Sequence, residues 1–382
     1  MYKSVCHKIE HRTEHPNQQT TVKMSSTNRA SLPESLGFIG LGAMGKPMVI
    51  NLANEIPLGS RIHVHDVVTA AMDELQELFP EKIIKCASAR EVTEKSVCYV
   101  KHWNHHPSTF HFLTRCFVKD VIFTMLPEGV HVKSVYLDPD NGILAALSSP
   151  PSPSSTTPSS LPGKLLIDSS TIDTATNLHV KQHLATSSPK TAFYDAPVSG
   201  GVLGAVNASI AFFLGCSASD PNVPRLTSLL RTMGAKVIPC GGPSLGLAAK
   251  LSNNYLSGII TIACAEAMDM GMRAGIDAHV LASVFAAGTA QNTICDVFNP
   301  VPGVCPRAPP SNGYRDGFRV ELMRKDVGLA LGMARTVGAK NILGASGLGV
   351  YAAASEAADC KGLDSRVVYR YLGGSEHWKA GE

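Results

Sequence analysis

The stretch that decides the fold is Leu36-Gly37-Phe38-Ile39-Gly40-Leu41-Gly42-Ala43-Met44-Gly45, an apolar run followed directly by a Gly-x-Gly-x-x-Gly turn. We expect the run to be a buried strand and the residues after the turn to form a helix. In such a turn the first glycine permits the tight reversal, the second lets the backbone approach a pyrophosphate, and the third lets the helix pack closely on the strand. The helix N-terminus then offers unpaired N–H groups to phosphate oxygens. The hexapeptide alone is a weak signal, because a Gly-rich surface turn has the same composition.

An acidic residue at the end of the next apolar run strengthens the dinucleotide interpretation. Asp66 follows the run from Arg61 to His65 and stands 21 residues after Gly45, where a carboxylate can accept hydrogen bonds from the adenosine ribose. Its charge would repel the additional phosphate of NADP, and no arginine follows it, so we predict NAD as the cofactor. The alternative is that Asp66 only caps the next helix. The predicted cofactor-binding residues in this part of the chain are Gly40, Leu41, Gly42, Ala43, Met44, Gly45 and Asp66.

Short apolar runs alternate with helical segments through the first half of the chain, which is typical of parallel strands buried on both faces and joined by helices. After about residue 240 the segments become rich in Ala, Leu and Met, and residues 248–274 could form one helix of more than seven turns. We therefore predict an α/β protein with a Rossmann domain over residues 36–200 and an all-α, mostly helical domain for substrate binding and oligomerisation over 201–382. The predicted strands are Leu36 to Ile39, Arg61 to His65, Val121 to Met125, Lys164 to Ile167 and Thr191 to Tyr194.

Three segments interrupt this pattern. Residues 1–35 are polar and lack the apolar region of a secretory signal, so we expect a disordered leader. Residues 149–161 are low-complexity Ser, Pro and Thr sequence that cannot bury enough apolar surface to order itself, and we expect a surface loop. Residues 97–119 hold cysteines and histidines in spacings that match no usual zinc site, so we expect an inserted loop and no metal. These side chains are Cys98, His102, His105, His106, His111 and Cys116.

Composition limits the classes of partner. The 382 residues are 44% hydrophobic and 17% charged, which are globular values for a chain long enough for two domains. A net charge of +3 without long basic blocks gives no footprint for nucleic acid. The most apolar helical stretch, Leu256 to Met268, is too short and too interrupted to span a membrane. The ten scattered cysteines fit free thiols in a reducing compartment. We therefore expect small-molecule partners.

Further motifs follow the glycine turn in a definite order: Met125-Leu126-Pro127, Asp168-Ser169-Ser170-Thr171, Asp195 to Gly201, Gly246 to Asn254, Asn299 to Gly303, and Lys325-Asp326. With them the sequence resembles the β-hydroxyacid dehydrogenase family over nearly all of residues 36–372, apart from the two insertions. The resemblance implies that Leu126 and Pro127 line the cofactor, that Thr171 touches it near the nicotinamide, and that Lys325 binds it from the second domain.

The resemblance also implies a substrate site at Ser199, Gly200 and Gly201, whose hydroxyl and amides would hold a carboxylate. This role makes physical sense, because small residues allow close approach of the backbone and successive N–H groups can form a concavity for an anion. The alternative is a simple turn at a domain boundary.

Lys250 and Asn254 are four residues apart at the start of the long predicted helix, so they share one face and could grip one hydroxyl. Oxidation of an alcohol by hydride transfer needs a group that removes the hydroxyl proton. A lysine desolvated in a cleft can be that base. The resemblance assigns this role to Lys250 and substrate hydrogen bonding to Asn254, whereas a helical lysine without such context is more often a solvated surface residue.

The reaction that the resemblance implies is NAD-dependent oxidation of 3-hydroxyisobutyrate to its semialdehyde, a step of valine breakdown. It places the protein in mitochondria, with the cytoplasm as the alternative, and the long apolar helix favours a homo-oligomer. Two other hypotheses stay open: an NADP-dependent reductase of tartronate, glyoxylate or succinic semialdehyde, and a non-catalytic nucleotide-binding scaffold, which predicts a lost lysine. Thr289 to Asn292 differ from a stretch found in some members near the substrate end, and one or two such side chains decide specificity.

Overall fold

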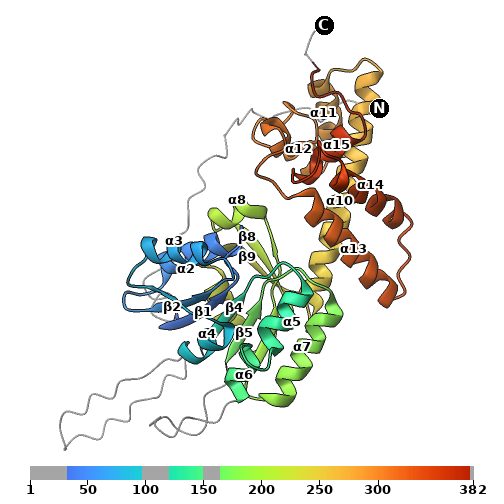
Figure 1. Ribbon diagram of the computed structural model, residues 1–382. Coiled ribbons are helices and arrows are strands. Elements are labelled where there is room, and N and C mark those ends of the chain that lie inside the picture. Colours follow the sequence, from blue (N-terminus) through green and yellow to red (C-terminus); the bar gives the residue numbers. More distant parts are fainter. Residues whose placement is uncertain (1–31, 97–119, 149–163, 379–382) are drawn as a thin grey trace, which may run out of the picture.

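The computed structural model describes residues 32–96, 120–148 and 164–378. The predictions for the leader before residue 32, for the 97–119 insertion and for the 149–161 loop lie outside the described residues. Within the described ranges the chain forms a six-stranded parallel sheet flanked by helices, a smaller sheet of three strands, and a helical region beyond them (Figure 1). The predicted α/β class is confirmed.

The large sheet has the strand order β3-β2-β1-β4-β5-β6, and all its pairs are parallel. This is the doubly wound order, in which ligands bind beyond the carboxyl ends of the strands where the order reverses, here between β1 and β4. All five predicted runs are strands. The sixth, β3, was missed because three residues are too few to show a pattern. The bounds are β1 Ser35–Ile39, β2 Arg61–His65, β3 Ile83–Lys85, β4 Val121–Thr124, β5 Leu165–Asp168 and β6 Ala192–Asp195.

Helices cover both faces of this sheet. Phe38 belongs to the core beneath helices α2 (Gly45–Glu55) and α3 (Thr69–Leu78). Its neighbour Ile39 belongs to the core on the other face, as alternate residues of a strand must. That second face is covered by α4 (Ala89–Lys95), α5 (Gly129–Leu137), α6 (Ile143–Ser148) and α7 (Thr174–Ser187). Burial on both faces explains why these strands are continuous apolar runs in the sequence.

Residues 198–239 form the smaller sheet, in the order β7-β8-β9, with an antiparallel first pair and a parallel second pair. Residues 201–239 were predicted to belong to the helical domain, and these strands were not predicted. The exposed Ala235 and Lys236 interrupt the apolar pattern of β9. β8 is a run of five apolar residues, buried and partly buried in turn, and its strand pattern was overlooked. Phe212 shares a core with Phe38, so we propose that the first domain extends to residue 244. The elements are β7 Val198–Ser199, α8 Gly201–Val206, β8 Ile210–Leu214, α9 Val223–Leu230 and β9 Gly234–Pro239.

The long helix predicted over residues 248–274 is α10, which spans Leu245–Arg273. It leaves the smaller sheet and runs through the helical region, where Met268, Tyr314, Tyr351 and Tyr369 are fully buried in a core of their own (Figure 1). The remaining helices are α11 Ala278–Ala287, α12 Thr293–Val297, α13 Val320–Thr336, α14 Gly344–Glu356 and α15 Val368–Tyr371. Among the described residues, no helix has the length and apolar character needed to cross a membrane.

Candidate active site

The glycine turn is closely packed at its ends and open in its middle. Gly40 has a φ of +94°, and a Cβ there would collide with the main-chain carbonyl of Met125. A Cβ at Gly45 would collide with the carbonyl of Gly40, because the helix starts directly against the strand. Gly42 is exposed and has open space where a Cβ would point. A turn with these properties fits the pyrophosphate of a dinucleotide.

Asp66 ties the glycine turn to the end of β2. Its Oδ2 accepts a hydrogen bond from the amide of Leu41 at 2.5 Å, and its Oδ1 accepts one from the amide of Val68 at 2.7 Å. Val68 is the N-cap residue of α3, so Asp66 supports that helix as well as the turn. Met44 begins α2 without a side-chain cap, and Ala43 is exposed. The predicted residues of the turn and Asp66 therefore lie together at the carboxyl edge of the sheet.

A buried aspartate joins the loops that follow β4 and β5. Asp168 Oδ1 accepts hydrogen bonds from the hydroxyls of Thr124 at 2.8 Å and Ser170 at 2.5 Å. Ser170 Oγ in turn accepts the amide of Leu126 at 2.8 Å. Burial raises the pKa of Asp168 to about 6, against the effect of these hydrogen bonds. Asp168 was not among the predicted site residues, because Thr124 lies 44 positions away in the chain.

Lys325 reaches both of these loops from helix α13. Its ammonium donates to the carbonyl of Thr171 at 2.8 Å and to the carbonyl of Pro127 at 3.1 Å. The same ammonium lies 3.3 Å from Asp326 Oδ1. Three residues predicted to contact the cofactor are thus brought together, and the helical region is connected to the cofactor side of the sheet.

Lys250 lies on α10 and is buried, with 7% of its surface exposed. Burial lowers the pKa of Lys250 from 10.5 to about 8, while the charge of Asp326 raises it and that of Lys325 lowers it. No residue in the described part of the chain accepts a hydrogen bond from the Lys250 amine. Asn254, one turn further, donates to Asp326 Oδ2 at 2.6 Å. A buried amine with a pKa near neutrality has the property that a general base needs.

Asp326 carries a negative charge that acts on both lysines and was not among the predicted site residues. Asp326 was named only as part of the Lys325-Asp326 pair, whereas the structure buries it to 2% exposure against Asn254 and within the field of Lys250. The available signal was a carboxylate directly after a predicted cofactor lysine, but its hydrogen-bond partner Asn254 is 72 residues away in the chain.

The Ser-Gly-Gly segment opens helix α8 after a short strand. Ser199 pairs with Ala211 across the β7–β8 ladder. Gly200 and Gly201 have φ values of +136° and +66°, and both are exposed. Exposed successive amides are available to an anion. Among the described residues, no hydrogen bond joins this segment to Lys250 or Asn254.

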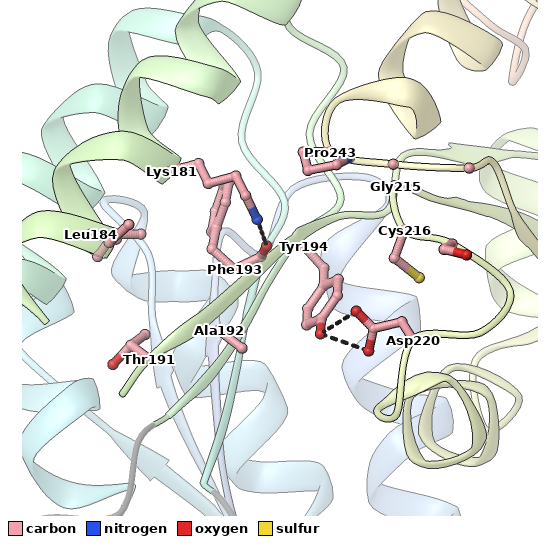
Figure 2. A pocket seen from close by; sticks show the side chains of 14 residues that line it. Lys181, Leu184, Thr191, Ala192, Phe193, Tyr194, Gly215, Cys216, Asp220 and Pro243 are labelled. Atoms are coloured by element: carbon pink, nitrogen blue, oxygen red, sulfur yellow. Dashed lines mark hydrogen bonds between the residues drawn. The ribbon is translucent and has the colours of Figure 1, made fainter. Parts of the chain in front are cut away.

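A pocket of about 330 Å³ lies between α7, β6 and the loops that follow β8 and β9 (Figure 2). None of the predicted site residues lines it. Three of its polar side chains are hydrogen-bonded within the protein, as Lys181 donates to the carbonyl of Phe193 at 3.1 Å and Tyr194 donates to Asp220 at 3.0 and 3.1 Å. We therefore assign no chemistry to this pocket.

Two family models together cover almost the whole described chain. The NAD binding domain of 6-phosphogluconate dehydrogenase matches residues 35–242, and the NAD-binding domain of NADP-dependent 3-hydroxyisobutyrate dehydrogenase matches residues 245–372.

Individual relatives agree with these matches. The probable mitochondrial 3-hydroxyisobutyrate dehydrogenase of Dictyostelium discoideum is 35% identical over 90% of this chain and 92% of its own length. The NAD-dependent L-serine dehydrogenase of Pseudomonas aeruginosa is 32% identical over 83% of this chain and 91% of its own. The solved structure of Mycobacterium tuberculosis 3-hydroxyisobutyrate dehydrogenase with L-serine has 30% identity and a TM-score of 0.72, covering 89% of this chain and 99% of that one. With such identity over nearly the full length, the chain belongs to the 3-hydroxyisobutyrate dehydrogenase family of nicotinamide-dependent oxidoreductases.

Proposed function

We propose that this protein oxidises 3-hydroxyisobutyrate to methylmalonate semialdehyde with NAD. The observation that carries the proposal is the state of Lys250, a buried amine with a pKa of about 8 beside Asn254 and Asp326. A scaffold that only binds nucleotide has no need of such a residue. The relatives named for this reaction support the choice of substrate.

Lys250 acts as the general base in this proposal. Its neutral amine takes the proton of the substrate hydroxyl and becomes an ammonium, and in the reverse direction the ammonium returns that proton to the carbonyl oxygen. A bound nicotinamide supplies the other half of the chemistry by accepting the hydride from the carbinol carbon. Asn254 holds the hydroxyl, and its own amide is fixed by the hydrogen bond to Asp326.

The substrate carboxylate binds, in this proposal, to the Ser199 hydroxyl and to the amides of Gly200 and Gly201. The support is that both glycines are exposed and hold backbone conformations that few other residues adopt.

Asp66 supports NAD over NADP. Its carboxylate is held beside the glycine turn by Leu41, where it would meet the ribose and repel a phosphate on it. We further propose a location in mitochondria, on the names of eukaryotic relatives. We also propose a homo-oligomer, because the long helix α10 exposes Leu256 and Met270.

The test is a spectrophotometric screen of the purified protein against 3-hydroxyisobutyrate, L-serine and other three- and four-carbon β-hydroxy acids, each with NAD and with NADP. We expect the highest kcat/KM with 3-hydroxyisobutyrate and NAD. L-Serine is the second candidate substrate, since one relative is named for it. Absence of NAD reduction with every acid would refute the function, and a preference for NADP would refute the role of Asp66.

A further inference from the structure

Helix α10, which carries Lys250, does not cap its own N-terminus. Its N-cap residue Ser244 has a φ of +62° and makes no side-chain cap. The caps come instead from Asp195, the last residue of β6. Asp195 Oδ1 accepts the amide of Ser244 at 2.8 Å and Oδ2 accepts the amide of Leu247 at 2.9 Å. Leu247 precedes Lys250 by less than one helical turn.

The surrounding chain is built around this carboxylate. A Cβ at Gly215 would overlap the Asp195 carboxylate, and a Cβ at Gly246 would lie 2.8 Å from its Oδ2. Neither glycine has a positive φ, so both positions require glycine for space. The amide of Gly215 also donates to the Asp195 carbonyl at 2.7 Å. Figure 2 shows three residues close in sequence to these groups, Tyr194, Gly215 and Pro243, which line the pocket between α7 and β6.

Charge favours the same arrangement. Asp195 is 2% exposed, and it stands at the positive end of a 29-residue helix. Burial raises the pKa of Asp195, whereas its hydrogen bonds from the amides of Leu247 and Ser244 lower it. When ionised, the Asp195 carboxylate accepts hydrogen bonds from the amides of Ser244 and Leu247, which no other described side chain caps.

Asp168 provides a contrast within the same sheet. It pairs with Asp195 in register across β5 and β6. However, its carboxylate contacts Thr124 and Ser170, and Ser170 accepts the amide of Leu126 in the loop predicted to line the cofactor. Two adjacent carboxylates thus support different elements, one the start of α10 and the other the loop after β4.

We propose that Asp195 is a positioning residue, which sets the place of Lys250 by capping helix α10 from the end of strand β6. This inference rests on the proposed role of Lys250 as the base. A small displacement of a reacting group can cost about 10²-fold in rate, so the link from β6 to α10 bears directly on turnover.

The test compares Asp195→Asn with Asp168→Asn, two buried and isosteric changes on neighbouring strands. In Asp195→Asn the side chain keeps one acceptor and turns an NH2 group toward the other amide. We expect kcat to fall about 30-fold, with the Kd of NAD within about twofold of the wild type. We expect Asp168→Asn to raise the Kd of NAD about fivefold with a smaller loss of kcat.

Hydrogen exchange gives a readout that does not depend on activity. In Asp195→Asn the amides of residues 244–250 should exchange faster, while those of β1 and β4 keep their protection. The proposal is wrong if Asp195→Asn and Asp168→Asn have the same effect on kcat and the same effect on the Kd of NAD. It is also wrong if hydrogen exchange of the amides of residues 244–250 is unaltered in Asp195→Asn. A wild-type protein without dehydrogenase activity would instead refute the proposed function, and the exchange result would still report on the cap.

Discussion

The start of helix α10 and the middle of helix α13 each bring one lysine close to Asp326, but the two lysines have opposite environments. Lys325 donates to two main-chain carbonyls and forms an ion pair, and its side chain is 24% exposed. Lys250 is 7% exposed, and no described residue accepts a hydrogen bond from it. A lysine whose donors are satisfied holds structure together, whereas a buried lysine without an acceptor readily gives up its proton.

The difference shows how two lysines from separate motifs, near one carboxylate, can have distinct properties. Both lysines are attracted by the same carboxylate, but for Lys250 burial outweighs that attraction and the pKa falls to about 8. Asp326 therefore limits how far the pKa falls, and it orients Asn254 at the same time. Environment, not residue type, separates the proposed base from the cofactor-side lysine.

The largest effect is expected for Lys250→Met, which keeps most of the length of the side chain and removes the amine. We expect kcat to fall by about 10³-fold, within the range for loss of a general base. The Kd of NAD should stay within about twofold, because Lys250 makes no hydrogen bond to the described cofactor loops. Steady-state NAD reduction and a fluorescence titration with NAD measure the two quantities. Retention of more than about a tenth of the turnover would contradict the assignment.

Lys325→Met should produce the converse pattern. It removes both hydrogen bonds to the loops that carry Pro127 and Thr171. We expect the Kd of NAD to rise about tenfold, with a loss of kcat far smaller than that of Lys250→Met. Lys340→Met, at an exposed position beyond the end of α13, is the matched control and should change neither quantity. A Kd for NAD equal to that of the wild type in Lys325→Met would contradict the role of Lys325 in cofactor binding that separates it from Lys250.

Asp326→Asn tests the carboxylate that the lysines share. Its charge raises the pKa of Lys250, so the pKa should fall in the variant. Since the neutral amine is the active form, kcat/KM rises with pH through this pKa, and its acidic limb should move to lower pH in Asp326→Asn. The retained amide oxygen can still accept from Asn254. The pH profile of kcat/KM checks the shift, and movement toward higher pH would exclude Lys250 as the titrating base.

Local sequence was sufficient for the parts of the fold whose signals are contiguous. The turn from Gly40 to Gly45 and the five longer strands of the large sheet could be predicted, because each shows its pattern within a few residues. Strand β9 could not, since its exposed Ala235 and Lys236 hide the apolar alternation. The predicted end of the first domain at residue 200 therefore lies before the boundary at residue 244 that we propose.

The residues proposed for the candidate site could be named from the sequence, and their roles stay predictions, but the contacts between them could not be foreseen. Asp168 meets Thr124 across 44 positions, Asp195 meets Ser244 across 49, and Asn254 meets Asp326 across 72. Only the fold brings such partners together. The burial of Lys250, on which its pKa depends, is likewise a tertiary property that helical spacing alone does not contain.

The smallest expected effect is a difference in stability between the two lysine variants. Because the pKa of Lys250 falls from 10.5 to about 8 on folding, the folded chain binds the proton less tightly than the unfolded chain. Below pH 8 both states are protonated and the full penalty applies, of the order of 3 kcal/mol, and it diminishes as pH rises from 8 toward 10.5. Lys250→Met should therefore raise the Tm at pH 7 by several degrees, with a smaller gain at pH 10. Lys325→Met should lower the Tm at both pH values, because it removes hydrogen bonds between the helical region and the sheet. Calorimetry at the two pH values measures these shifts, and a Tm gain for Lys250→Met that is no larger at pH 7 than at pH 10 would contradict the lowered pKa of the amine.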